Sequence, residues 1–267
     1  MPHFGVDMIY EVVKGVGLPF LGTLLGSLCV FLMRDRINST VEKALGGFAA
    51  GVMIAASVWS LLIPSLEYSS DKGRLAFVPT ILGFMLGVFF VLFLDVWVDR
   101  VLCKNGDLQV VNTGAKNSAI MVTAISVHNL PEGMAVGIVY ASIAFGGADM
   151  SFDFALALAL GIAIQNFPEG AIVSMPLKSK GMSAPAAFGF GVISGFVELA
   201  GAILTLFVAS YVICIMPYML AFAAGAMMYV VAVELLPEMS AGKRSYTGVI
   251  AFGLGFCLMM AMDTALG

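Results

Sequence analysis

Eight long apolar stretches limit how this chain can fold. A helix that crosses a membrane needs about 20 mostly apolar residues, and each of these stretches provides them. They cover about residues 9–33, 44–66, 75–98, 117–143, 152–177, 183–211, 215–239 and 246–265. The sequence therefore predicts an all-α integral membrane protein in which residues 1–267 form a single domain of eight transmembrane helices.

The composition supports this class of protein and argues against several others. Of the 267 residues, 60% are hydrophobic and 11% are charged, whereas soluble proteins contain roughly a quarter charged residues. The net charge of −4 comes without a basic patch, so no nucleic-acid partner is expected. The cysteines form no CxxC pair, which argues against a disulfide framework and a thiolate zinc site. They are Cys29, Cys103, Cys214 and Cys257.

Lys and Arg residues in the connections predict the orientation in the membrane. Loops on one side carry ten of them: Arg34, Arg36, Lys43, Arg100, Lys104, Lys116, Lys178, Lys180, Lys243 and Arg244. The other side carries only Lys72 and Arg74, with Lys14 near the start of the first span. Because positively charged loops stay in the cytoplasm, both termini are predicted to lie outside it. The loop over residues 99–118 is predicted to be cytoplasmic.

A polar motif occurs twice inside the apolar stretches. The first motif, residues 128–133, reads His-Asn-Leu-Pro-Glu-Gly, and the second motif, residues 165–170, reads Gln-Asn-Phe-Pro-Glu-Gly. In each copy the first residue and the Glu stand four apart, so on a helix they share one face. The Pro crowds the carbonyl four residues before it, and the Gly allows another backbone to approach. Polar clusters inside a membrane normally mark function.

The side chains of the two motifs form a plausible ligand set for a borderline divalent cation. They are His128, Asn129, Glu132, Gln165, Asn166 and Glu169. Glu198 of the sixth span is a further candidate ligand at a similar depth. At the rise of an α-helix, His128, Gln165 and Glu198 lie roughly 17, 20 and 22 Å along their spans, near the middle of about 30 Å of hydrocarbon.

The charge count supports a bound cation. No Lys or Arg occurs between Lys116 and Lys178, or between Lys180 and Lys243. A charged Glu at this depth costs at least ~2.5–3.5 kcal/mol when nothing compensates it. The carboxyl groups are therefore either protonated or completed by a cation, and the neutral His and amide ligands beside them favour the cation.

The second and seventh spans resemble each other. Residues 48–51, Phe-Ala-Ala-Gly, recur as residues 222–225, and at the same offset of 174 residues Met53 matches Met227 and Ser60 matches Glu234. These two spans are predicted to run in opposite directions. The match therefore suggests an inverted repeat, which in secondary transporters surrounds a site near the membrane midplane. Close helix packing alone is the other explanation for the small residues.

With these motifs the sequence resembles the ZIP (Zrt/Irt-like) family of metal transporters, in particular its GufA-like branch. The resemblance covers essentially the whole chain, and the pair of motifs is highly specific. It implies a 3+2+3 arrangement in which helices 1–3 and 6–8 form an inverted repeat. It also implies an elevator-type carrier in which spans one, four, five and six move against spans two, three, seven and eight.

The resemblance further implies a two-metal centre. One metal would be held by His128, Glu132, Gln165 and Glu169, with Met53 nearby. The second would be held by Asn129, Asn166 and Glu198, with Glu132 and Glu169 bridging. Some relatives have Asp at the position of Asn166, where the neutral amide lowers the negative charge. Glu234 matches a family position that faces the metal path near its cytoplasmic exit.

The predicted function is uptake of a divalent transition metal toward the cytoplasm. Zinc is the favoured substrate, and cadmium, iron(II) and manganese are alternatives. A carrier or channel for another cation or for protons is the next hypothesis. An intramembrane metallohydrolase is disfavoured because the chain has no H-E-x-x-H motif. No enzyme activity and no catalytic cofactor are expected. The predicted location is a bacterial inner membrane, and the candidate assembly is a homodimer.

Overall fold

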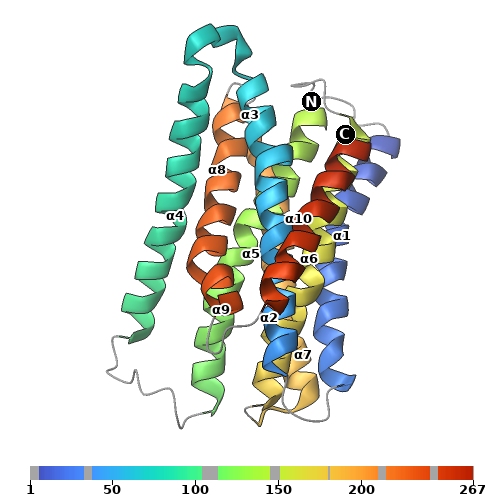
Figure 1. The fold of residues 1–267 in the computed structure, drawn as a ribbon, viewed down its shortest axis with the longest axis vertical. Coiled ribbons are helices and arrows are strands. Elements are labelled where there is room, and N and C mark those ends of the chain that lie inside the picture. Colours follow the sequence, from blue (N-terminus) through green and yellow to red (C-terminus); the bar gives the residue numbers. More distant parts are fainter. Residues whose placement is uncertain are drawn as a thin grey trace.

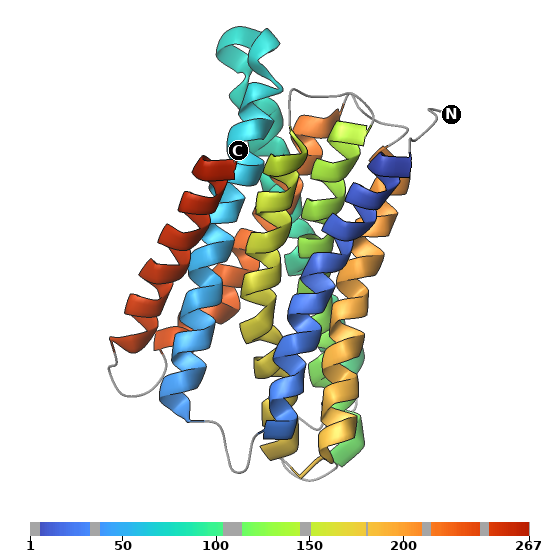
Figure 2. The ribbon, with the colours of Figure 1, turned by 90° about the vertical axis from the view of Figure 1, so that its right-hand side faces the viewer.

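The computed structural model describes residues 6–32, 38–103, 114–144, 151–179, 181–209, 215–240 and 246–266. These residues form helices and short turns, and no strand occurs among them. The long helices lie side by side along the long axis of the molecule, and α1 begins at the end of the bundle where α10 ends (Figures 1 and 2). The prediction of an all-α protein is confirmed.

The helices have the following bounds. They are α1 (Val6–Leu32), α2 (Ser39–Ala56), η1 (Ser57–Leu62), α3 (Ile63–Glu67), η2 (Ser70–Leu75), α4 (Phe77–Cys103), α5 (Gly114–Ala144), α6 (Phe152–Ser179), α7 (Ala184–Ala209), α8 (Met216–Val230), η4 (Val231–Leu235), α9 (Leu236–Ser240) and α10 (Thr247–Leu266). The segments α2–η1–α3 and α8–η4–α9 follow one another without a break. Each of these runs therefore acts as one long helix.

Seven helical segments of the described chain are long and apolar enough to cross a membrane. They are Tyr10–Leu32, Ser39–Glu67, Phe77–Trp97, Phe152–Ser179, Ala184–Val208, Met216–Leu235 and Thr247–Leu266. The remaining predicted span, 117–143, falls on α5, whose side chains are described only from Asn129 onward. Of the predicted loop 99–118, residues up to Cys103 belong to α4 and those from Gly114 belong to α5, while residues 104–113 lie outside the description.

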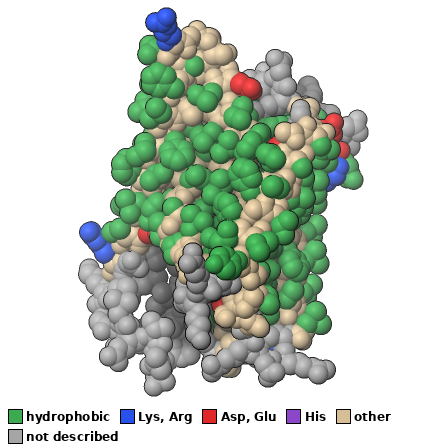
Figure 3. All heavy atoms as spheres, in the orientation of Figure 1, with side chains coloured by type: hydrophobic (Ala, Val, Ile, Leu, Met, Phe, Trp, Pro, Cys, Tyr) green, Lys and Arg blue, Asp and Glu red, His purple; other side chains and the backbone are tan. Residues whose placement is uncertain are grey.

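The surface matches a protein that is surrounded by lipid. Hydrophobic side chains cover most of the face seen in Figure 3, and the Lys and Arg side chains visible there lie at its margins. On α4 large side chains such as Phe89, Phe93 and Trp97 are more than half exposed. Lipid tails solvate such a surface, whereas water would not. The finding supports a multi-pass membrane protein.

The helices pack in two groups. In the first group α1 pairs with α6 and α5 pairs with α7, and α1 also packs against α7. In the second group α2 pairs with α10 and α4 pairs with α8. These pairings are the most extensive in the structure, and the contacts between the groups are smaller, chiefly α2 with α6 and α5 with α8. We call them the α1/α5/α6/α7 group and the α2/α4/α8/α10 group.

Two pairs of helices in the second group cross in the same way. Gly51 of α2 lies against the backbone carbonyl of Phe252 in α10, so closely that a Cβ would overlap it. Gly225 of α8 lies in the same way against the carbonyl of Phe84 in α4. Gly51 and Gly225 end the two Phe-Ala-Ala-Gly sequences that the chain repeats after 174 residues. The repeated sequence therefore performs the same packing task in both helices.

Two π-helical segments occur at corresponding positions. Segment η1 begins at Ser57 and η4 begins at Val231, again 174 residues apart. Each precedes a proline, Pro64 or Pro237. Because proline cannot donate a backbone hydrogen bond and crowds the carbonyl four residues back, the wider π turn accommodates it. Such segments are frequent at functional sites.

Candidate metal centre

The two polar motifs lie within the long helices α5 and α6. Both helices continue through their prolines, Pro131 and Pro168. Polar side chains beside these prolines face the protein interior: Glu132 is 1% exposed, and Asn129 and Asn166 are also buried. The motifs therefore place carboxylate and amide groups inside the bundle rather than on its lipid face.

The glycine that ends each motif lets a neighbouring helix approach. A Cβ on Gly133 would overlap the backbone carbonyl of Glu198 in α7. A Cβ on Gly170 would overlap the carbonyl of Thr23 in α1. The expected close backbone approach is confirmed at both positions. It brings α7 against the first motif and α1 against the second.

In each motif the asparagine forms a hydrogen bond to the helix that lies against the glycine of that motif. Asn129 Nδ2 donates to Ser194 of α7, with the carbonyl oxygen at 3.4 Å and Oγ at 3.1 Å. Asn166 Nδ2 donates to the carbonyl oxygen of Pro19 in α1 at 3.2 Å. The two motifs thus make equivalent contacts, the first with α7 and the second with α1.

A hydrogen-bonded chain joins the second motif to Glu198. Gln165 Nε2 donates to Asn166 Oδ1 at 2.9 Å, and Asn166 Nδ2 donates to Glu198 Oε2 at 2.7 Å. All three residues are buried, with Glu198 only 2% exposed. Among the described residues, neither Gln165 Oε1 nor Glu198 Oε1 has a hydrogen-bond partner. These two oxygens are therefore available to a ligand.

Three other carboxyl groups lie near that of Glu169. Glu132, Glu198 and Glu234 are all close enough to Glu169 to act on it electrostatically. Glu169 and Glu234 are partly buried. Nearby carboxylates repel one another and favour a cation among them. The structure thus brings Glu132, Glu169 and Glu198 together, with Glu234 of η4 close by.

All the predicted metal ligands remain predictions, His128 and Met53 included. His128 lies on α5, but its side chain is outside the described part of the structure. Met53 is fully buried on α2, which packs against α6. Among the described side chains, no group of three or more His, Cys, Asp and Glu is arranged to hold a metal ion. The donors that the structure assembles are a mixed set, in which amide oxygens stand beside carboxylates.

The sequence interpretation missed the contribution of α1 to this centre. Pro19 accepts the hydrogen bond from Asn166, and Thr23 lies close to the Glu198 carboxylate. Further along α1, Ser27 Oγ donates to the carbonyl of Gly170 at 3.3 Å. Thr23 and Ser27 stand four residues apart in an apolar span, so they share a helix face. That spacing is the signal that could have identified α1 as a neighbour of the motifs.

A buried carboxyl group also lies outside the centre. Asp263 of α10 is 5% exposed, and its Oδ1 accepts a hydrogen bond from Ser60 Oγ of η1 at 2.7 Å. Its place near the end of a span gave no functional expectation. The structure shows that the π turn of η1 carries the hydroxyl group that holds this carboxyl group in the bundle.

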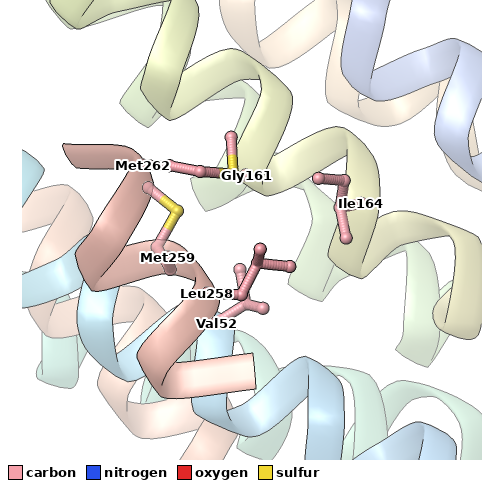
Figure 4. A pocket seen from close by; sticks show the side chains of 6 residues that line it. All are labelled: Val52, Gly161, Ile164, Leu258, Met259 and Met262. Carbon is pink, nitrogen blue, oxygen red and sulfur yellow. The ribbon is translucent and has the colours of Figure 1, made fainter. Parts of the chain in front are cut away.

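A small apolar pocket marks the boundary between the two helix groups. It is lined by Val52 of α2, Gly161 and Ile164 of α6, and Leu258, Met259 and Met262 of α10 (Figure 4). The Met259 thioether fills the space where a side chain at Gly161 would lie. The pocket lies one helical turn before Gln165, but without polar lining it is no part of the metal centre.

Comparisons with known proteins identify the family of this chain. The family described as ZIP zinc transporter matches residues 104–263. The zinc transporter ZIP11 of Xenopus tropicalis is 33% identical, over 98% of this chain and 99% of that protein. Zinc transporter ZIPB of Bordetella bronchiseptica is 34% identical, over 98% and 83%, and zinc transporter GufA of Myxococcus xanthus is 32% identical, over 98% and 100%. The chain therefore belongs to the ZIP zinc transporter family, a family of transporters and not of enzymes, as one of its GufA-like members.

Proposed function

We propose that this protein carries divalent transition metal, zinc before other ions, across the membrane toward the cytoplasm. One observation carries the proposal: the buried carboxyl groups of Glu132 and Glu198 and the partly buried one of Glu169 gather, although the stretches 117–177 and 181–242 that hold them contain no Lys or Arg. Isolated buried charges are costly, so a cation is the natural complement. The relatives that are named zinc transporters make zinc the first candidate.

The donors of the centre suit a metal that exchanges its water for protein ligands. Glu132 and Glu169 supply negative charge, and Gln165 Oε1 supplies a neutral oxygen without a hydrogen-bond partner among the described residues. His128 would add the nitrogen ligand that zinc prefers. The amide oxygen also suits manganese, a harder ion, which makes manganese the main competitor.

We further propose that transport follows an elevator-type alternating access. The α1/α5/α6/α7 group holds the donors of both motifs and packs mainly within itself, as does the α2/α4/α8/α10 group. Smaller contacts between the groups favour relative sliding of two rigid bodies. In this mechanism the first group moves with the metal, and the second group stays as the scaffold.

The repeated contacts support the proposed 3+2+3 arrangement with an inverted repeat. The Gly51 and Gly225 crossings relate α2 to α8 and α10 to α4. The bonds of Asn129 to α7 and of Asn166 to α1 relate α5 to α6 and α7 to α1. All these relations pair helices of the first three predicted spans with helices of the last three, and the fourth with the fifth. Eight spans with both termini outside the cytoplasm fit this symmetry.

Zinc uptake into proteoliposomes tests the proposed function. Glu132→Ala and Glu169→Ala should each lower the initial rate of zinc uptake to background, because each removes a carboxyl ligand. Glu67→Gln is the matched control, since it removes one carboxylate at an exposed position of α3 and should leave uptake unchanged. The same assay with competing manganese, iron(II) and cadmium ranks the substrates.

The proposal fails if both alanine variants fold and still take up zinc like the wild type. Folding is checked by the elution profile and helical circular dichroism of the purified variants. If the protein takes up manganese but no zinc, the proposed site stands and manganese becomes its substrate.

A further inference from the structure

We propose that the Asn166 amide takes the place of a second metal ion, so that the centre binds a single divalent cation. This inference rests on the proposed function and defines its stoichiometry. The resemblance to the family implied two ions, with Asn166 and Glu198 among the ligands of the second. The hydrogen bonds of these two residues argue against that assignment for this chain.

The orientation of the Asn166 amide is determined by its partners. The carbonyl oxygen of Pro19 can only accept a hydrogen bond, so the amide nitrogen must face it, at 3.2 Å. The same nitrogen lies 2.7 Å from Glu198 Oε2. Its two N–H groups therefore have one acceptor each. No N–H group can coordinate a cation, so this edge of the amide is closed to a metal.

The oxygen of the same amide is also engaged. Asn166 Oδ1 accepts a hydrogen bond from Gln165 Nε2 at 2.9 Å. This bond turns Gln165 Oε1 away from Asn166, and that oxygen has no partner among the described residues. Gln165 can thus serve as a ligand, whereas Asn166 serves to position both Gln165 and Glu198.

The amide also supplies the polar partner that Glu198 needs in the membrane. A buried carboxyl group requires hydrogen bonds or a counter-ion, and the Asn166 amide provides a neutral donor to Glu198 Oε2. A cation at Glu198 Oε2 would have to displace the amide and would meet its positive N–H edge. Glu198 Oε2 therefore links α7 to α6 in place of binding a second ion.

The asparagine of the first motif, Asn129, does not offer a second ion the ligand that Asn166 lacks. Asn129 Nδ2 is turned toward the Ser194 carbonyl, as Asn166 is toward Pro19. The α1 residue that lies against the second motif, where α7 has Glu198 against the first, is the uncharged Thr23. Only one such position carries an acid, so the corresponding position beside the second motif adds no carboxylate for a second ion.

Metal stoichiometry of the full-length protein in nanodiscs tests the inference. Equilibrium dialysis against zinc, followed by elemental analysis, should give one ion per wild-type chain. Asn166→Asp should give two, because it replaces the N–H edge by a carboxylate oxygen that faces Glu198. Adding Glu198→Gln to Asn166→Asp should return the stoichiometry to one.

The outcomes separate this inference from the proposed function. Two ions in the wild type would overturn the inference and leave metal transport standing. A single ion in both the wild type and a folded Asn166→Asp variant would also overturn it. A wild-type protein that binds no zinc would overturn the proposed function itself. The wild-type measurement decides the question even if the variant does not fold.

Discussion

At the scale of single residues, Gln165 is the position that most affects which metal the centre prefers. It occupies in the second motif the place that His128 occupies in the first. Its amide is fixed by the bond to Asn166, which leaves Oε1 as a hard, neutral donor. An imidazole at this place would be a softer donor, and zinc gains more from such a nitrogen than manganese does.

We therefore expect Gln165→His to raise the preference for zinc over manganese. A gain on the order of tenfold, or about 1.4 kcal/mol, would be typical of one improved ligand. The measurement is manganese competition against zinc uptake in proteoliposomes, with Gln165→Ala as the control that removes a donor without adding one. An unchanged ratio in a folded Gln165→His variant would exclude Gln165 from the ligand set.

Sequence reasoning could identify these polar residues but not the directions of their bonds. The absence of Lys and Arg nearby was enough to predict that Glu132, Glu169 and Glu198 need a partner. Whether that partner is an ion or an amide depends on side chains from α1 and α7 that meet only in the folded protein. In the folded protein Asn166 donates a hydrogen bond to Glu198. The sequence alone gave no sign of this bond and led to both residues being predicted as metal ligands.

At the scale of helices, backbone contacts at glycine determine how closely the motif helices approach their neighbours. Gly133 lets α5 approach the Glu198 carbonyl of α7, and Gly170 lets α6 approach α1. These crossings hold the donors of three helices at fixed separations. The motif glycines are thus part of the centre although they offer no ligand.

Gly133→Ala should destabilise the protein, since the added methyl group would overlap the Glu198 carbonyl. Overpacking of this kind costs typically about 1–3 kcal/mol. Gly189→Ala on α7 is the matched control, because nothing lies within 4 Å of its added Cβ and alanine favours a helix. Thermal unfolding in detergent compares them. Equal midpoints for the two variants would show that α5 and α7 can separate at no cost.

Helix pairing itself was beyond the sequence pattern. The spans are apolar on nearly all sides, so hydrophobic periodicity does not reveal which face packs against protein. The Phe-Ala-Ala-Gly repeat indicated that α2 and α8 correspond. That α2 pairs with α10 and α8 with α4 depends on packing and was recognised only in the structure. The same holds for the π segments η1 and η4, which precede Pro64 and Pro237.

At the scale of the whole molecule, the boundary between the two helix groups is where the proposed motion must occur. Apolar side chains of α2, α6 and α10 meet there around the small pocket of Figure 4. Contacts between these apolar side chains carry no hydrogen bond that sliding would break, whereas Tyr68 after α3 and Ser142 of α5 form one elsewhere on the boundary. The same pocket therefore offers positions for testing the motion, because its lining includes helices of both groups.

Cross-linking distinguishes motion between the groups from a fixed pathway. After the four native cysteines are replaced by alanine, Val52→Cys and Ile164→Cys would place one thiol on α2 and one on α6, in different groups. Val52→Cys and Leu258→Cys would place both thiols in the α2/α4/α8/α10 group. All three positions line the same pocket.

A short, reducible bifunctional thiol reagent should abolish zinc uptake for the first pair and spare it for the second, because only the first bridge joins bodies that slide. Reduction should restore uptake. A fully cross-linked first pair that still transports zinc would contradict the elevator mechanism and favour a pathway through a static bundle.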